Sequence, residues 1–275
     1  MQYCSAIYLA VFLPITLLVY ALTAKKKRWL VLLIASYIFF LSLSGKLIVY
    51  LLFSTLSIHH FGLWIDKFNK NRDKELEKCS KEQKKEIKEA YKKKTNMIVL
   101  FAVLIHIGLL VILKYTGFFG ENINNLLSLF NTDFRFKIPK ICIPIGISFY
   151  TFQILTYVID VYKGKVGVQK SVINLGCYIS AFPQLIAGPI VRYETVNEEL
   201  DERCENIENF ATGIRRFIIG LFKKVVIANE MAYVADTLFG SDIAQLGVIG
   251  MVVGGIAFTF QIYFDFSGYS DMAIG

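Results

Sequence analysis

Charged residues are scarce in this 275-residue chain. They make up 19% of the sequence, whereas hydrophobic residues make up 55% and the mean hydropathy is +0.51. A soluble globular protein must cover itself with a largely polar surface, and this composition is too apolar to supply one. The composition therefore excludes an ordinary soluble domain.

Cysteine and histidine are sparse as well, and common catalytic signatures are missing. The five cysteines are scattered without a Cys-x-x-Cys pair, so neither a zinc site nor a disulfide framework is indicated. The chain has no P-loop, GxGxxG, HExxH or GxSxG motif. The three histidines, His59, His60 and His106, lie in uncharged segments, where ionisable side chains are costly and often functional. Because His59 and His60 are near a predicted membrane edge and a neutral His106 can bond between helices, we assign none of them a catalytic role and predict no metal site.

Seven uncharged segments account for about half of the chain. A bilayer core about 30 Å thick requires roughly 20 residues of apolar helix, and most of these segments are long enough. The segments are residues 1–24, 29–45, 47–65, 95–113, 141–159, 171–191 and 243–264. Gly45 and Lys46 are predicted to form a tight external turn between the second and the third of them. The sequence thus predicts an all-α, polytopic membrane protein whose first partner is the lipid bilayer.

Basic residues gather beside these segments. The net charge is +8, Lys25 to Arg28 directly follow the first segment, and residues 66–94 hold twelve Lys or Arg against seven Asp or Glu. Cytoplasmic loops carry such a basic excess, so we interpret it as topology and not as a nucleic-acid partner. The first segment has no basic residues before it, unlike a cleavable signal peptide, which indicates a retained helix with an external N-terminus.

The basic segment 66–94 has helical spacing of its few apolar residues. We predict one solvated amphipathic helix, either a simple connector or a helix that contacts anionic lipid headgroups. Residues 115–140 are predicted to be external, with an Asn-rich part that lies along the interface. Residues 214–239 mix cations with large apolar side chains, a pattern that favours an interfacial helix.

Proline and glycine interrupt two of the uncharged segments. Pro144 and Gly146 predict an irregular start for residues 141–159. Pro183, Gly188 and Pro189 lie in the second half of residues 171–191. Backbone groups freed in hydrocarbon are tolerated only where protein or water surrounds them. A broken or re-entrant helix beside a cavity and a plain span are both compatible with residues 171–191.

Polar groups suited to chemistry accompany that interruption. Gln184 supplies an amide and Arg192 a cation beside the predicted break, and together they are suited to hold an anionic or carbonyl-bearing substrate. Alternatively, Arg192 anchors the chain at the interface.

A second polar stretch follows the last uncharged segment and contains Asp265, Ser267, Tyr269 and Asp271. A carboxylate near the bilayer needs a partner or a wet cavity. On a continuous helix the two carboxylates lie about 120° apart, so we predict that they contact different neighbours. The alternative is that they mark the membrane edge.

At these residues the chain resembles the membrane-bound O-acyltransferase family, in its bacterial alginate O-acetyltransferase-like branch. The matching stretches occur in order along most of residues 141–275 and are residues 148–153, 160–164, 180–193, 222–229 and 258–271. The related teichoic acid D-alanyltransferases share the Gly-Pro-Ile core, but they carry an acidic residue before the Arg and lack Gln after the first Pro. Val191 and Gln184 at those positions favour the acetyltransferase branch.

This resemblance implies a fold and an activity. It implies a helical bundle with broken or re-entrant helices around a tunnel, of which residues 1–275 form the N-terminal part of a single transmembrane acyltransferase domain. The family's catalytic histidine is expected beyond Gly275, so we expect a truncated chain that is inactive alone. The implied reaction moves an acetyl group from a cytoplasmic donor, acetyl-CoA or a similar molecule, toward O-acetylation of an extracellular or cell-wall polysaccharide, with no bound cofactor. An extracytoplasmic SGNH-like acetyltransferase is the implied partner, and the bacterial plasma membrane is the implied location.

The resemblance also implies supporting roles for the polar residues. Pro183, Gly188 and Pro189 would shape the broken helix, and Gln184 and Arg192 would line or brace the tunnel. Asp265, Ser267, Tyr269 and Asp271 would orient the catalytic region.

Three other functions remain open. The first is D-alanyl transfer to teichoic acid by the related branch, and the second is a non-catalytic membrane scaffold. The third is a secondary transporter, which usually shows internal repeats, and residues 1–140 and 141–275 show no convincing repeat.

Overall fold

The computed structural model describes residues 4–78, 80, 83–129, 135–139, 141–185, 190–196, 206–241 and 243–275. Nearly all of them are helical, and no strand occurs among these described residues. A helix satisfies its own backbone hydrogen bonds, which an apolar environment requires of each segment. The prediction of an all-α protein is confirmed.

The chain divides into two compact units. We call Tyr20–Phe182 with Val191–Leu200 the central unit, and Met1–Val19, Pro183–Ile190 and Asp201–Gly275 the C-terminal unit.

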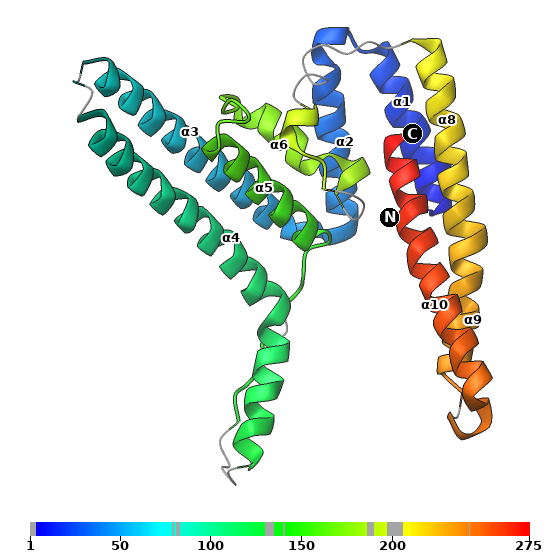
Figure 1. Cartoon of the computed structure of the whole chain (residues 1–275). Coiled ribbons are helices and arrows are strands. Elements are labelled where there is room, and N and C mark those ends of the chain that lie inside the picture. Colours follow the sequence, from blue (N-terminus) through cyan, green and yellow to red (C-terminus); the bar gives the residue numbers. More distant parts are fainter. Residues whose placement is uncertain are drawn as a thin grey trace. The chain divides into compact units, whose positions relative to one another are not determined.

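The central unit is built mainly from helices α2 to α6 (Figure 1). They are α2 (Arg28–Ser44), α3 (Ile48–Lys78), α4 (Gln83–Leu129), α5 (Ile147–Tyr162) and α6 (Val172–Ser180), with 3₁₀ turns at Lys25–Lys27 and Gly45–Leu47. Helix α3 packs against α4, α5 and α6, and α2 packs against α6. The core between them is aromatic and aliphatic, with Phe39, Ile58, Ile154 and Leu175 fully buried.

Two predicted glycine positions shape the central unit. Gly45 has a φ of 52° and ends α2, and its N–H donates to the carbonyl of Leu41. Gly146 has a φ of 71° and directly precedes α5, so residues 141–146 are not helical. Positive φ is inexpensive only for glycine, and therefore both turns were readable from the sequence. The predicted turn at Gly45 and the irregular start before α5 are confirmed.

The basic segment 66–94 forms a helical hairpin, and the prediction of one helix is wrong. Helix α3 runs on to Lys78, and α4 starts at Gln83 and returns beside it (Figure 1). The Tyr91 hydroxyl donates to the Glu75 carboxylate over 2.7 Å, and its ring lies 6.4 Å from that of Phe68. Ser80 and Gln83 have the Ser-x-x-Gln spacing of a capping box, and their side chains are 3.4 Å apart. That local signal starts a second helix where the apolar spacing predicted a continuous one.

Helix α4 is longer than predicted. It has 47 residues and continues to Leu129, a length of about 70 Å. The Asn-rich part that we expected to lie along the interface continues this helix as far as Leu129. Residues 135–139 run back along it, because the Asn124 amide donates to the Phe136 carbonyl over 3.0 Å and accepts from the Phe136 N–H over 2.8 Å.

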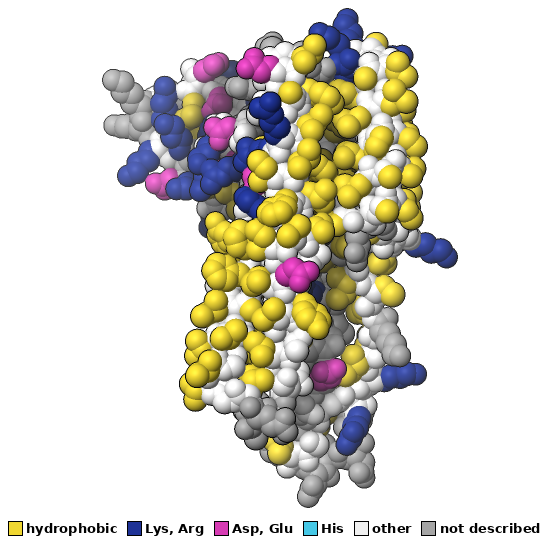
Figure 2. Space-filling model, turned by 90° about the vertical axis from the view of Figure 1, so that its right-hand side faces the viewer, with side chains coloured by type: hydrophobic (Ala, Val, Ile, Leu, Met, Phe, Trp, Pro, Cys, Tyr) yellow, Lys and Arg dark blue, Asp and Glu magenta, His cyan; other side chains and the backbone are white. Residues whose placement is uncertain are grey.

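Three described helical stretches are long and apolar enough to cross a membrane: Lys25–Lys78, Gln83–Leu129 and Leu246–Ile274. Large apolar side chains stand exposed along them, for example Leu104 and Ile112 on α4. Figure 2 shows hydrophobic side chains over much of the face in view. Such extended apolar surface marks contact with lipid and not with water, so the chain is a membrane protein.

The C-terminal unit is built on a long helical hairpin. Its first arm runs from α8 (Ile207–Phe222) through a π-helical turn at Lys223–Ala228 into α9 (Asn229–Phe239). Its second arm is α10 (Ile243–Ile274), which packs against all three parts of the first arm (Figure 1). A π-helix at Tyr8–Phe12 leads into α1 (Leu13–Leu22) at the start of the chain.

Candidate functional site

The uncharged segment 171–191 contains a helix that stops early. Helix α6 has nine residues, about 14 Å, which is half of what a bilayer core requires. The chain is not helical at Ala181 and then makes a 3₁₀ turn at Phe182–Gln184. Of the two alternatives for this segment, the plain span is wrong and the break in the helix is confirmed, whereas the cavity expected beside it stays a prediction.

Neighbouring helices supply partners for the backbone around this break. The N–H of Phe182 donates to the Ser36 hydroxyl on α2 over 3.1 Å. The Gln153 amide on α5 donates to the Tyr178 carbonyl over 3.1 Å, and the Tyr178 hydroxyl donates to the Val191 carbonyl over 2.7 Å. Freed polar groups are therefore bonded within protein, as the cost of leaving them in lipid requires.

Three tyrosines fix the chain after the break. The Tyr193 ring meets those of Tyr157 and Tyr178 edge to face, with centroids 5.0 Å and 5.2 Å away. Gln169 donates from its side chain to the Tyr193 hydroxyl over 2.8 Å and from its backbone to the Tyr157 hydroxyl over 2.9 Å. Sequence reasoning missed Tyr157 and Tyr178. The available signal was a tyrosine inside an uncharged segment, where its hydroxyl needs a partner.

The predicted residues of the break are divided between the two units. Pro183 and Gln184 lie in the 3₁₀ turn and belong to the C-terminal unit. Arg192 belongs to the central unit, where its side chain is exposed between the anchored residues Val191 and Tyr193. Gly188 and Pro189 lie outside the described residues. The roles of Pro183, Gly188 and Pro189 in shaping the broken helix, and of Gln184 and Arg192 in lining or bracing a tunnel, stay predictions.

A charged cluster joins α8 and its π-helical turn to α10. We define it as Arg216, Lys223, Lys224, Asp265, Ser267 and Asp271. The Lys223 ammonium lies 2.6 Å from the Asp271 carboxylate and 3.2 Å from the Ser267 hydroxyl. The Arg216 guanidinium reaches the other Asp271 oxygen at 3.1 Å.

Asp265 has a different partner, Lys224, at 2.5 Å. The prediction that the two carboxylates contact different neighbours is therefore confirmed. Each carboxylate is paired with one or two cations of the first arm. The alternative that the two carboxylates only mark the membrane edge does not account for these pairs. Three cations against two carboxylates leave the charged cluster with one excess positive charge.

Glycines bring the two arms close enough for these pairs. A Cβ added at Gly220 would lie 2.5 Å from the carbonyl oxygen of Gly268, and one added at Gly268 would lie 2.7 Å from that of Gly220. Gly213 and Gly275 repeat this approach two turns away, again at 2.5 Å. Small residues allow helix backbones to touch in this way in membranes. Gly213 and Gly220 are seven residues apart, and so are Gly268 and Gly275. This spacing was the available sequence signal, and sequence reasoning did not use it.

The π-helical turn explains how adjacent lysines reach the same helix. Side chains of consecutive residues on a regular α-helix point about 100° apart. Lys223 and Lys224 begin the π-helix, yet each reaches a carboxylate on α10. Single π-helical turns within α-helices are often found at functional sites.

The charged cluster also bears on the interpretation of residues 214–239. Arg216, Lys223 and Lys224 bind carboxylates on α10, whereas Ile218 and Phe222 are more than half exposed. An interfacial helix would turn its cations to water. Here only Lys223 and Lys224 are largely covered by protein, whereas Arg215 and Arg216 are exposed. The interfacial helix that we predicted therefore stays a prediction, with part of its basic face used for ion pairs with α10.

One hydrogen bond connects the two predicted motifs. The Tyr269 hydroxyl on α10 donates to the Pro183 carbonyl over 2.7 Å, within the C-terminal unit. Tyr269 is buried, with 8% of its surface exposed. The structure thus brings together two of the predicted residues that are 86 positions apart in the sequence.

Backbone carbonyls engage all three histidines. The rings of His59, His60 and His106 lie 3.1, 2.8 and 2.7 Å from the carbonyl oxygens of Lys170, Leu56 and Ala102. These contacts fit packing roles. Among the residues that the structure describes, no three His, Cys, Asp or Glu side chains gather where they would hold a metal ion.

Both motifs lie in the part of the chain that matches a known family. Residues 167–275 match the MBOAT, membrane-bound O-acyltransferase, family. The chain is 33% identical over 275 residues to the probable alginate O-acetylase AlgI of Pseudomonas putida, a match that covers 100% of this chain and 52% of that protein. The chain belongs to the membrane-bound O-acyltransferase family.

Two further relatives differ in their named acceptors. The peptidoglycan O-acetyltransferase of Helicobacter pylori is 34% identical over 214 residues, 68% of this chain and 39% of that protein. The teichoic acid D-alanyltransferase of Bacillus subtilis is 26% identical over 138 residues, 48% of this chain and 34% of that protein. The chain spans about half the length or less of these curated relatives.

Proposed function

We propose that this protein serves as a membrane-bound O-acetyltransferase of the bacterial plasma membrane. In this proposal an acetyl group leaves a cytoplasmic thioester donor such as acetyl-CoA and reaches a hydroxyl of an extracellular or cell-wall polysaccharide. The identity to the alginate and peptidoglycan enzymes over all or most of this chain carries the proposal. Residues 1–275 would form one transmembrane acyltransferase domain with an external N-terminus.

The reaction breaks the C–S bond of the donor and forms a C–O bond to the acceptor, while a base takes the hydroxyl proton. We assign that base to none of His59, His60 and His106, because none of them lies at the position that the resemblance implies for the catalytic histidine, which is expected beyond Gly275. An extracytoplasmic SGNH-like acetyltransferase is the proposed partner that delivers the acetyl group to the polymer.

We propose that residues of this chain hold the turn after α6 and helix α10 in position. The Tyr269 hydroxyl and the Ser36 hydroxyl each hold one residue of the 3₁₀ turn after α6. The charged cluster fixes α10 against the first arm of its hairpin. Small displacements of reacting groups lower the reaction rate by large factors. We therefore propose that these contacts hold the turn after α6 and helix α10 in place so that the donor is precisely oriented.

Labelled acetyl-CoA tests the proposal. Membranes from cells that express the full gene should incorporate the acetyl label into extracytoplasmic polymer, and Arg192→Ala and Asp265→Ala should lower incorporation at equal protein yield. Arg215→Ala is the matched control, because Arg215 is an exposed cation of α8 to which we assign no role. Unchanged incorporation by both variants would refute the assigned roles.

D-alanyl transfer to teichoic acid is the second candidate, supported by the identity to the Bacillus subtilis enzyme. Labelled D-alanine distinguishes the two, because only this second activity places it in the polymer. A membrane scaffold or a secondary transporter would place neither label there. Incorporation of D-alanine alone, or of neither label, would overturn the acetyltransferase proposal.

A further inference from the structure

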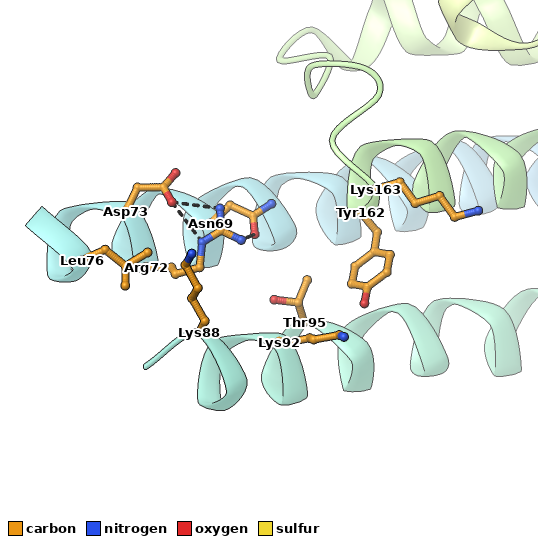
Figure 3. Close-up of a pocket in the computed structure, with 9 residues that line it drawn as sticks. All are labelled: Asn69, Arg72, Asp73, Leu76, Lys88, Lys92, Thr95, Tyr162 and Lys163. Carbon is orange, nitrogen blue, oxygen red and sulfur yellow. Dashed lines mark hydrogen bonds and ion pairs between the residues drawn. The ribbon is translucent and has the colours of Figure 1, made fainter. Parts of the chain in front are cut away.

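A cavity of about 630 Å³ opens between the hairpin of α3 and α4 and the end of α5 (Figure 3). It lies in the central unit and is separate from the break after α6 and from the charged cluster. Its walls carry four cations, Arg72 on α3, Lys88 and Lys92 on α4, and Lys163 directly after α5.

Cations outnumber carboxylates in this lining by four to one. The single carboxylate is Asp73, and Arg72 already binds it through two nitrogens at 2.9 Å each. The three lysines face the same space without another carboxylate among the described lining residues. Their mutual repulsion is relieved when an anion enters.

The secondary structure holds these cations together. Lys88 and Lys92 are four residues apart and lie on one face of α4. Figure 3 shows Lys88 beside Arg72, while Lys92 and Lys163 lie nearer Tyr162. The Tyr162 hydroxyl donates to the Asn96 side chain of α4, which fixes the end of α5, and with it Lys163, beside α4.

The positions of the uncharged segments place the cavity at the predicted membrane edge, where lipid phosphates lie. Thr95 and Asn69 form its inner end. Thr95 is buried and begins the uncharged segment 95–113, and Asn69 lies four positions after Ile65, where the uncharged segment 47–65 ends. Lys88 lies seven residues beyond Thr95, about 10 Å along the helix. The headgroup layer of a leaflet is about 5 to 8 Å thick, so the lysines reach it and the water beyond.

We propose that this cavity is a phosphate-binding site, occupied by the phosphate of an anionic lipid headgroup or by that of a soluble phosphate-bearing molecule. The proposal rests on four cations that line one cavity at the predicted membrane edge, whose single carboxylate is already paired. The site is independent of acyl transfer, and its tests measure binding alone.

The test compares two double variants of α4. Lys88→Gln with Lys92→Gln removes two cations from the cavity, and Lys85→Gln with Lys93→Gln removes two exposed cations of the same helix that do not line it. The soluble arm titrates the purified protein with inorganic phosphate and follows phosphorus NMR line broadening. The lipid arm reconstitutes it in vesicles of phosphatidylcholine with or without phosphatidylglycerol and counts retained phosphatidylglycerol by native mass spectrometry.

The cavity variant should bind its probe about thirtyfold more weakly, given the usual contribution of a cation near a membrane surface. The control variant should bind like the parent protein, and Lys88→Arg with Lys92→Arg should preserve binding. A selective loss in the vesicle arm identifies a lipid headgroup, and one in the phosphate arm identifies a soluble ligand. Equal binding by the cavity and control variants in both arms would overturn the proposal. If the cavity variant fails to purify, Lys163→Gln beyond the end of α5 provides the same comparison.

Discussion

The Tyr269 hydroxyl donates to the Pro183 carbonyl oxygen over 2.7 Å, and this bond ties the C-terminal part of α10 to the turn that follows the broken helix. Phenylalanine at position 269 keeps the ring and removes the donor. We expect Tyr269→Phe to destabilise the protein by about 0.5 to 2 kcal/mol, the range for single hydrogen bonds inside membrane proteins. Unfolding in detergent, followed by circular dichroism, measures the change.

Tyr263→Phe is the matched control, because Tyr263 is on the same helix and is 63% exposed. It should unfold like the parent protein. Equal stability of the two variants would show that the Tyr269 bond does not hold the turn in place.

Contact between the backbones of α8 and α10 gives the second prediction. A methyl group at Gly220 would meet the Gly268 carbonyl oxygen at 2.5 Å, and backbone cannot yield as a flexible side chain can. Gly220→Ala should therefore separate the arms and cost about 1 to 3 kcal/mol, as overpacking commonly does. Gly255→Ala on α10 meets nothing within 4 Å and should be neutral or slightly stabilising, as alanine favours helix. Stability equal to that of Gly255→Ala in detergent unfolding would contradict the close approach.

Local conformation was the part of the fold that the sequence predicted well. Gly45 and Gly146 permit a positive φ, and Pro183 restricts the backbone, each at its own position. The turn, the irregular helix start and the break after α6 were therefore all anticipated. The separate partners of Asp265 and Asp271 followed from helical geometry alone.

Packing between distant segments was not predictable in the same way. The seven-residue spacing of Gly213 and Gly220 marks a face of small residues, but it does not indicate that Gly268 will meet that face. That contact depends on which helices pair and in what register. The same holds for the Tyr193 ring between Tyr157 and Tyr178. The hairpin in the basic segment was missed for another reason, since the spacing of its few apolar residues outweighed the capping signal at Ser80.

Removing the negative charge of Asp271 should cost more than removing that of Asp265. Asp271 is 18% exposed and holds two cations, whereas Asp265 is 47% exposed and holds one. Asp271→Asn leaves Lys223, itself largely covered, without its charge partner, and we expect a loss of about 1 to 3 kcal/mol. Asp265→Asn should lose about 1 kcal/mol or less, as exposed pairs do. Denaturant unfolding of both variants ranks them, and the reverse order would refute the assignment of Asp271 as the centre of the charged cluster.

Ser36 provides the last prediction, because from helix α2 it supports the start of the break within the central unit. Its hydroxyl accepts the Phe182 N–H at 3.1 Å, and both residues are buried. Ser36→Ala leaves that N–H without this acceptor, which should cost about 1 to 3 kcal/mol. Ser42→Ala is the control, because the Ser42 hydroxyl bonds only within its own helix, to the Phe39 carbonyl, and is exposed. Amide hydrogen exchange read by mass spectrometry should show faster exchange at Phe182 in Ser36→Ala and no change there in Ser42→Ala. Slow exchange at Phe182 in both variants would mean that the broken helix is held by other contacts.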